Sequence, residues 1–132
     1  MEYSKAMIWT GRTMSGLVVL FMIFDVSIKY LDLPIVEQTG IPLGLPAHSA
    51  RGLAVMETVI LLIYVWPRTA VLGAVLFTGL FGATMAIHWR VGDPLFSHIL
   101  FGFYLALLAW GGLWLRDARL RALLPLNAVT DN

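Results

Sequence analysis

Four long apolar stretches alternate with short polar ones along the chain. The clearest is 69–87, which has no charged side chain, and the next is 95–115, which has a single histidine near its start. A helix needs about 20 residues to cross the roughly 30 Å apolar core of a bilayer, where every backbone donor must be satisfied internally. The pattern therefore predicts an all-α fold with membrane-spanning helices over 7–30, 46–65, 67–88 and 95–115.

The connections between these stretches favour an up-down-up-down four-helix bundle. The tight sequence "WPRT" places Pro67 at a first helical position, and Asp93 followed by Pro94 is expected to cap the fourth helix. Residues 32–48, rich in proline and glycine, are expected to form one long loop. After residue 115, arginines alternate with leucines, which predicts a short surface helix over about 116–124. One domain is expected over 1–132.

Small residues in the third and fourth spans predict close helix contacts. They recur at spacings of three or four, which brings them onto one helix face. The residues in question are Gly79, Gly82, Ala83, Ala86, Gly102 and Ala106.

Composition narrows the class of protein and the chemistry open to it. The chain is 59% hydrophobic and 13% charged, whereas soluble domains carry about a quarter charged residues. A net charge of +1 provides no basic surface for nucleic acid. The absence of cysteine excludes thiol nucleophiles, disulfide exchange and iron–sulfur clusters. Catalysis would therefore depend on histidine, carboxylates, lysine, hydroxyl groups or a borrowed cofactor.

The distribution of basic residues predicts an orientation in the cell (inner) membrane. Basic residues concentrate on the cytoplasmic side of membrane proteins. The side that the termini share holds Lys5, Arg12, Arg68, Arg116, Arg119 and Arg121, whereas the other side holds Lys29, Arg51 and Arg90. Both termini are therefore predicted to be cytoplasmic.

Ionisable residues inside the spans gather in the extracytoplasmic half. Asp25 and Lys29 are four residues apart and share a helix face. Glu57 lies about 16 Å from Pro46 at 1.5 Å per residue, near mid-membrane. A carboxylate in hydrocarbon costs roughly 2.5 kcal/mol or more. We therefore expect Glu57 to pair with a cation on another helix, and Lys29 is the predicted partner.

Polar residues at neighbouring helix ends complete the expected site. Convergent polar groups above an apolar interior are typical of small-molecule sites, so we expect a cavity that touches Glu57 and His88 and opens toward the extracytoplasmic face or outer leaflet. Catalytic roles are assigned to Glu57, His88 and Lys29, and ligand contacts to Asp25, Arg51, Arg90 and His98.

Structural alternatives stay open for several of these residues. Asp25 and Lys29 would also serve as a plain intrahelical ion pair, Arg90 as a lipid headgroup contact, and His98 as a capping or interfacial residue. The two histidines lie near helix ends without a matched second pair, so no metal or haem site is predicted.

The stretches "GRTMSGLVVLFMIFDVSIKY", "RGLAVMETVILLIYVWPRTAVLGAVLFTG", "HWRVGDPLFSHILF" and "WGGLWLRDARLRALLPL" resemble the DoxX-like membrane proteins. The best-shared features are Lys29, Glu57 and the tight turn before a glycine-rich helix. "DVSIKY" departs from the glycine-xx-lysine pattern common in the broader family. The resemblance implies a four-helix membrane fold. It implies function only loosely: the family name derives from a thiosulfate:quinone oxidoreductase subunit, and other members associate with redox or stress proteins.

Three functions follow from these observations. The first is a redox-associated module that binds a lipophilic ligand such as a quinone. The second is a membrane acid–base enzyme that acts on a small lipophilic substrate. The third is a proton-coupled carrier, which is the least favoured because the chain lacks inverted repeats. Besides the bilayer and the ligand, the expected partners are redox proteins or further copies of the chain.

Overall fold

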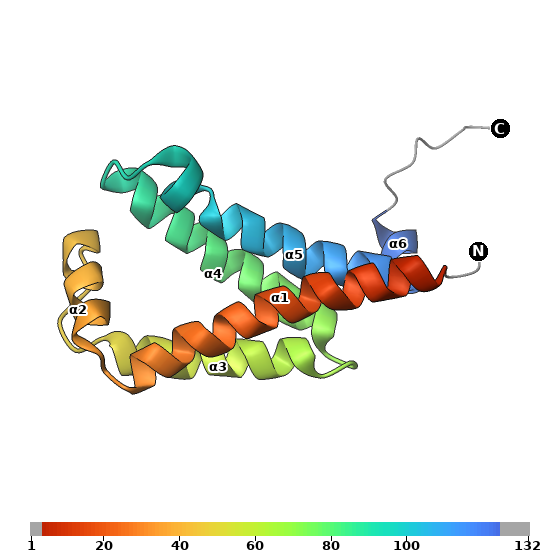
Figure 1. Ribbon diagram of the computed structural model, residues 1–132, viewed down its shortest axis with the longest axis horizontal. Coiled ribbons are helices and arrows are strands. Elements are labelled where there is room, and N and C mark those ends of the chain that lie inside the picture. Colours follow the sequence, from red (N-terminus) through yellow and green to blue (C-terminus); the bar gives the residue numbers. More distant parts are fainter. Residues whose placement is uncertain (1–3, 125–132) are drawn as a thin grey trace.

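The computed structural model describes residues 4–124, and residues 1–3 and 125–132 of the expected domain lie outside it. Every regular element in the described part is a helix, and no strand is present there. Three stretches are long and apolar enough to cross a membrane, namely α1 (Lys5–Tyr30), α4 (Ala70–Arg90) and the joined elements over Leu95–Arg116 (Figure 1). The all-helical class is therefore confirmed, and three of the four expected spans coincide with helical stretches that could cross a membrane.

The fourth long helix, α3 (Ala50–Val65), is shorter than the other three stretches, at 16 residues. It begins four residues after the expected start at Pro46. His48 has a φ of 60°, and this left-handed conformation interrupts any helix that would pass through it. At 16 residues, α3 as a membrane crossing stays a prediction.

The long helices pack around a shared core. α1 packs against α3 and α5 (Phe101–Arg116), and α4 packs against the same two helices (Figure 1). Within the core, the rings of Phe77 and Phe81 stack at 5.0 Å, and Phe77 meets the ring of Tyr64 at 5.3 Å. Outward-facing side chains are apolar, with Leu20 65% exposed and Leu62 61% exposed. An apolar exterior of this kind suits lipid contact.

The expected stripe of small residues explains only part of the helix packing. A Cβ on Gly102 would lie 2.7 Å from the Phe81 carbonyl oxygen, so α4 and α5 do approach closely there. By contrast, Gly79 and Gly82 face open space with no atom within 4 Å of such a Cβ. Further close approaches include those at Gly73, against Tyr64, at Gly112, against Ser15, and at Gly11, against the Gly112 carbonyl and Arg116. Close helix packing thus depends mainly on glycines other than Gly79 and Gly82.

The expected long loop over 32–48 is wrong in part, because it contains α2 (Pro34–Gly40) and the 3-10 helix η1 (Ile41–Leu43). Pro34 occupies the first helical turn, where a missing N–H removes no hydrogen bond. A proline read as a loop signal therefore starts a helix. Gly44 ends the segment at a φ of 83°, which glycine adopts without steric cost. We call α2 and η1 together the α2–η1 segment.

The entry to the last span also differs from expectation. Pro94, not Asp93, is the N-cap, and no side chain caps this end. This span begins with a π-helical turn, η2 (Leu95–Ile99), in which Leu100 N–H donates to the Leu95 carbonyl at 2.9 Å. Likewise, α4 begins after Thr69 instead of at Pro67. The short helix expected over 116–124 is present as α6 (Ala118–Leu123).

Candidate functional site

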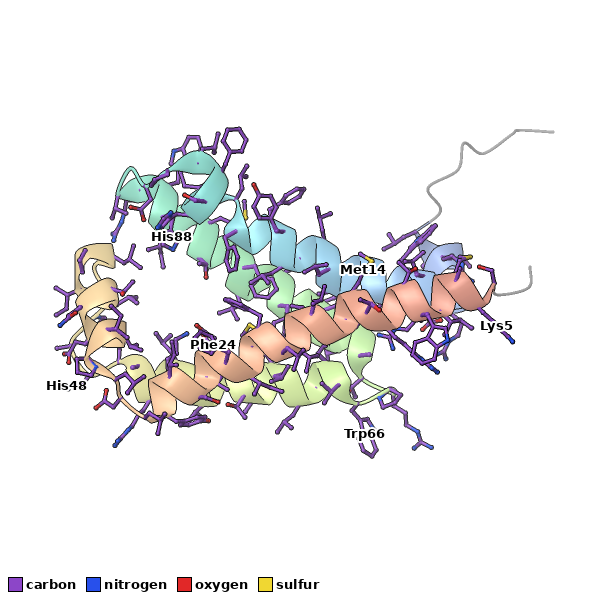
Figure 2. All side chains as sticks on the ribbon, viewed as in Figure 1. Lys5, Met14, Phe24, His48, Trp66 and His88 are labelled. Atoms are coloured by element: carbon purple, nitrogen blue, oxygen red, sulfur yellow. The ribbon has the colours of Figure 1, made fainter. Side chains whose placement is uncertain are left out.

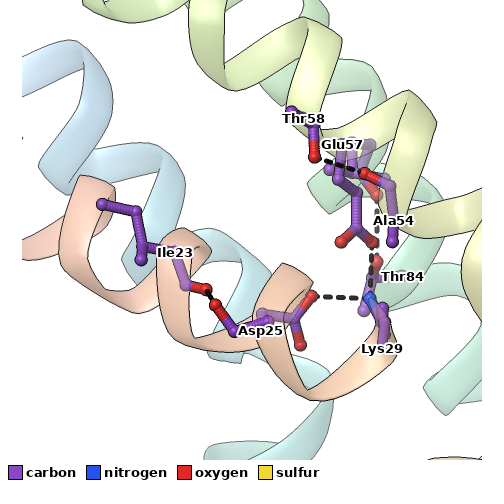
Figure 3. Close-up of polar contacts among 9 residues, drawn as sticks. Ile23, Asp25, Lys29, Ala54, Glu57, Thr58 and Thr84 are labelled. Carbon is purple, nitrogen blue, oxygen red and sulfur yellow. Dashed lines mark hydrogen bonds and ion pairs between the residues drawn. The ribbon is translucent and has the colours of Figure 1, made fainter. Parts of the chain in front are cut away.

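An ammonium group between two carboxylates forms the centre of the candidate site. Lys29, in the last turn of α1, donates to Asp25 Oδ2 one turn earlier at 2.6 Å and to Glu57 Oε1 of α3 at 2.6 Å. Figure 3 shows the lysine reaching between the two helices. The predicted Lys29–Glu57 pair is therefore confirmed. We refer to Asp25, Lys29 and Glu57 as the triad.

The triad has an excess of acceptors. Glu57 is 5% exposed, and its second oxygen, Oε2, is buried without a hydrogen-bond partner among the described residues. With all three groups ionised, two carboxylates and one ammonium leave one uncompensated negative charge. A buried charge that lacks a partner is costly. The triad therefore favours one more proton, one more hydrogen-bond donor or a cation.

His88 forms a second polar group on the facing helix. It lies in the last turn of α4, and its Nδ1 is 2.5 Å from Asp93 Oδ2. Asp93 is therefore the partner of His88 and not a helix cap, which corrects the sequence-based assignment. The His98 ring meets the His88 ring edge-on at 5.8 Å, and His98 Nδ1 hydrogen-bonds Ser97 Oγ at 2.8 Å. The π-helical turn thus brings the two predicted histidines together.

A cavity of about 400 Å³ connects the triad with His88. The α2–η1 segment forms one of its walls, and the ends of α1, α3 and α4 form the others (Figure 2, where His88 and His48 are labelled). Asp25, Lys29, Glu57 and His88 all line it. Its apolar walls include Ile28, Ile35, Val36, Leu53, Leu80 and Ile87. The expected cavity that touches both Glu57 and His88 is present in the structure.

Three predicted ligand-contact residues lie outside this cavity lining. Arg51 is exposed at the start of α3, and His98 is exposed beside His88. Arg90 instead donates from Nη2 to the Leu43 carbonyl of η1 at 2.9 Å, and its guanidinium packs over Gly44. Arg90 therefore joins the end of α4 to the wall of the cavity without lining it.

Sequence reasoning missed a second buried polar cluster at the opposite end of the helices. There, Ser15 Oγ and Tyr64 Oη are 2.8 Å apart, and Arg116 Nη2 donates to Ser15 Oγ at 2.8 Å. Ser15 and Tyr64 appear in the sequence as ordinary residues of apolar helices, so no local pattern marks them. The contact of Arg116 with α1 is tertiary and leaves no sequence signal.

Comparison with known proteins agrees with the resemblance seen in the sequence. Residues 13–112 match the family model described as the DoxX-like family, and this range includes the triad and His88. No curated protein and no solved structure matches the chain. Within residues 4–124, no group of three or more histidine or carboxylate side chains is placed to hold a metal ion.

Proposed function

Because the chain belongs to the DoxX-like family of membrane proteins, we propose that it binds a small lipophilic, quinone-like ligand in the cavity between the triad and His88. In this proposal the four long helices form an up-down-up-down bundle in the cell membrane, with α3 as the fourth crossing. Both termini lie in the cytoplasm, and the cavity lies in the extracytoplasmic half. The basic residues near the helix ends support this orientation.

The unpartnered Glu57 Oε2 beside the Lys29 ammonium carries the proposal. A hydroxyl group on the ligand would add the donor that the triad lacks, and a ligand carbonyl would accept from Lys29. An ammonium has three N–H groups, and Asp25 and Glu57 take two of them. Lys29 and Glu57 are thus complementary to the carbonyl of a quinone and the hydroxyl of a quinol, respectively.

The remainder of the cavity suits a ring of this kind. Its walls are mainly aliphatic. Besides the triad and His88, the ionisable lining residues are Asp32, Glu37 and His48, in and around the α2–η1 segment. A volume of about 400 Å³ falls within the roughly 300–1,000 Å³ usual for small-molecule sites. The chain has no cysteine, so in a redox role the electrons would pass between the bound ligand and partner redox proteins.

Binding of a short-chain ubiquinone analogue and its quinol tests the proposal. The full chain in lipid nanodiscs is titrated with each form, and Glu57→Gln is compared with Arg51→Gln, which removes a charge outside the cavity lining. We expect saturable binding to the wild type and to Arg51→Gln. We expect Glu57→Gln to weaken quinol binding by about tenfold, equivalent to about 1.4 kcal/mol. Absence of saturable binding, or equal binding by Glu57→Gln, would overturn it.

The His88–Asp93 pair supports a second candidate, a membrane acid–base enzyme for a small lipophilic substrate. A carboxylate on Nδ1 fixes the tautomer of the imidazole and leaves Nε2 free to accept a proton. Because His88 lines the cavity, its ring lies beside the space that a substrate would fill. Turnover of a lipophilic substrate by the purified protein without partner proteins would favour this candidate.

A further inference from the structure

We propose a second binding site, for a phosphate-type anion such as a lipid headgroup, at Arg116 on the end of the molecule opposite the cavity. Arg116 ends α5, and its Nε donates to the Gly112 carbonyl at 3.0 Å while Nη2 donates to Ser15 Oγ at 2.8 Å. A guanidinium has five N–H donors, so three N–H groups remain. Among residues 4–124, no carboxylate forms an ion pair with Arg116.

The guanidinium is held in place by a directed chain of hydrogen bonds. Tyr64 Oη donates to the Ala109 carbonyl at 2.8 Å, so its oxygen is left to accept from the Ser15 hydroxyl at 2.8 Å. The Ser15 oxygen then accepts from Arg116. Ser15 and Tyr64 are both buried, which shields these hydrogen bonds from competing water. A planar cation fixed in this way is preorganised for two-point contact with phosphate oxygens.

Arg116 lies at the edge of a pocket of about 500 Å³. The pocket is bounded by α1, the turn between α3 and α4, and the junction of α5 with α6. Val19, Val65 and Leu113 supply apolar walls beside the charged groups. Charged groups beside apolar walls suit a phospholipid, because its phosphate can contact the cations and its acyl chain can contact the apolar walls. Basic pockets between membrane helices are known to bind anionic headgroups.

The charges around the pocket favour an anion. Besides Arg116, the lining holds Arg119 and one carboxylate, Asp117, so two cations and one anion leave a net charge of +1. Burial raises the pKa of the Asp117 carboxyl, but hydrogen bonds from the Arg119 backbone N–H and side chain outweigh this and lower the pKa below its ordinary value. Asp117 is thus ionised and already paired with Arg119, whereas Arg116 has no anionic partner in the described residues.

The test uses the full chain in nanodiscs of phosphatidylcholine with or without phosphatidylglycerol, and in phosphatidylcholine discs with added inorganic phosphate. Native mass spectrometry counts retained phospholipid, and thermal unfolding reports stabilisation. We expect the wild type to retain phosphatidylglycerol over phosphatidylcholine and to unfold at a higher temperature in its presence. If inorganic phosphate stabilises the protein as much as phosphatidylglycerol does, the anion is free phosphate. If inorganic phosphate does not stabilise the protein, the anion is the lipid headgroup.

Two variants separate this site from general surface attraction. In Arg116→Gln, we expect the preference for phosphatidylglycerol over phosphatidylcholine to fall by about tenfold, equivalent to about 1.4 kcal/mol. Arg68→Gln, an exposed arginine in the turn between α3 and α4, is expected to keep it. An equal loss in both variants would overturn the proposal. So would a wild type without preference for either anion, and that measurement does not depend on the folding of any variant.

Discussion

The ammonium of Lys29, near the end of α1, is 2.6 Å from Glu57 Oε1 in α3. This contact joins two helices through charged groups, next to the hydrogen bond between Tyr30 Oη and Thr58 Oγ1. Asp25 holds the same ammonium from within α1. The three side chains therefore act as one unit, and removal of any one of them changes the charge balance of the other two.

Removal of Lys29 should cost more stability than removal of Glu57. Lys29→Met leaves two carboxylates without a cation, and breakage of a buried pair costs about 3–5 kcal/mol. Glu57→Gln leaves Lys29 paired with Asp25 and removes the excess negative charge, so we expect a smaller loss, of at most the roughly 1.5–3 kcal/mol typical of a hydrogen bond to a charged group. Unfolding of both variants in detergent would measure the order. A smaller loss for Lys29→Met would contradict the triad as described.

Replacement of His88 should affect the cavity, and replacement of His98 should not. His88 lines the cavity and bonds Asp93, whereas His98 is exposed and outside the lining. We expect His88→Phe to weaken ligand binding by about tenfold, or 1.4 kcal/mol, and His98→Phe to leave it nearly unchanged. The readout is the same quinol titration. Equal effects of the two changes would place the ligand outside the cavity.

A side chain at Gly44 should destabilise the α2–η1 segment. Its φ of 83° costs an L-residue about 1–2 kcal/mol, and a Cβ there would lie 2.6 Å from Arg90 Nη2. We therefore expect Gly44→Ala to loosen the α2–η1 segment and to raise amide hydrogen exchange there. Gly52→Ala, where a Cβ meets open space in α3, is the matched control and should leave exchange in this segment unchanged.

The proposed orientation predicts where a C-terminal reporter is active. A reporter that is active only in the cytoplasm should be active when fused after Asn132, and a reporter that is active only outside it should be inactive there. The basic bias predicts that both termini are cytoplasmic. A partner fusion that inserts the reporter after Gly40, in the α2–η1 segment, should be active only on the other side of the membrane. The reverse pattern would show that the orientation is wrong.

Strong physical constraints made part of this structure predictable from sequence. Glu57 inside an apolar helix had to face the bundle interior, pair with a cation or be protonated. Of the two cations at a suitable depth, Lys29 was favoured over Arg51 because it lies on another helix, and their contact agrees with that prediction. Where two local rules competed, sequence reasoning was wrong. Asp93 before Pro94 fits a helix cap, but the nearby His88 offers the carboxylate a stronger partner.

Other features depend on tertiary contacts that no local pattern encodes. Arg51 was expected at the site by depth, yet the start of α3 leaves it exposed. The Ser15–Tyr64–Arg116 cluster joins α1, α3 and α5 across the chain, and nothing in the spacing of these residues marks it. The α2–η1 segment was read as a loop because proline and glycine are common to loops and to helix starts and ends.

The short length of α3 has a consequence for the surrounding lipid. As a crossing, its 16 residues measure about 24 Å at 1.5 Å per residue, several ångströms less than the roughly 30 Å hydrocarbon core. Such hydrophobic mismatch is relieved by local thinning of the bilayer. If α3 crosses the membrane as proposed, the thinned lipid would lie against the cavity, because Ala50 and Leu53 at the start of α3 line it. An amphiphile would thus travel a shorter distance from the headgroup layer to Lys29, and bilayers of longer acyl chains should slow its entry.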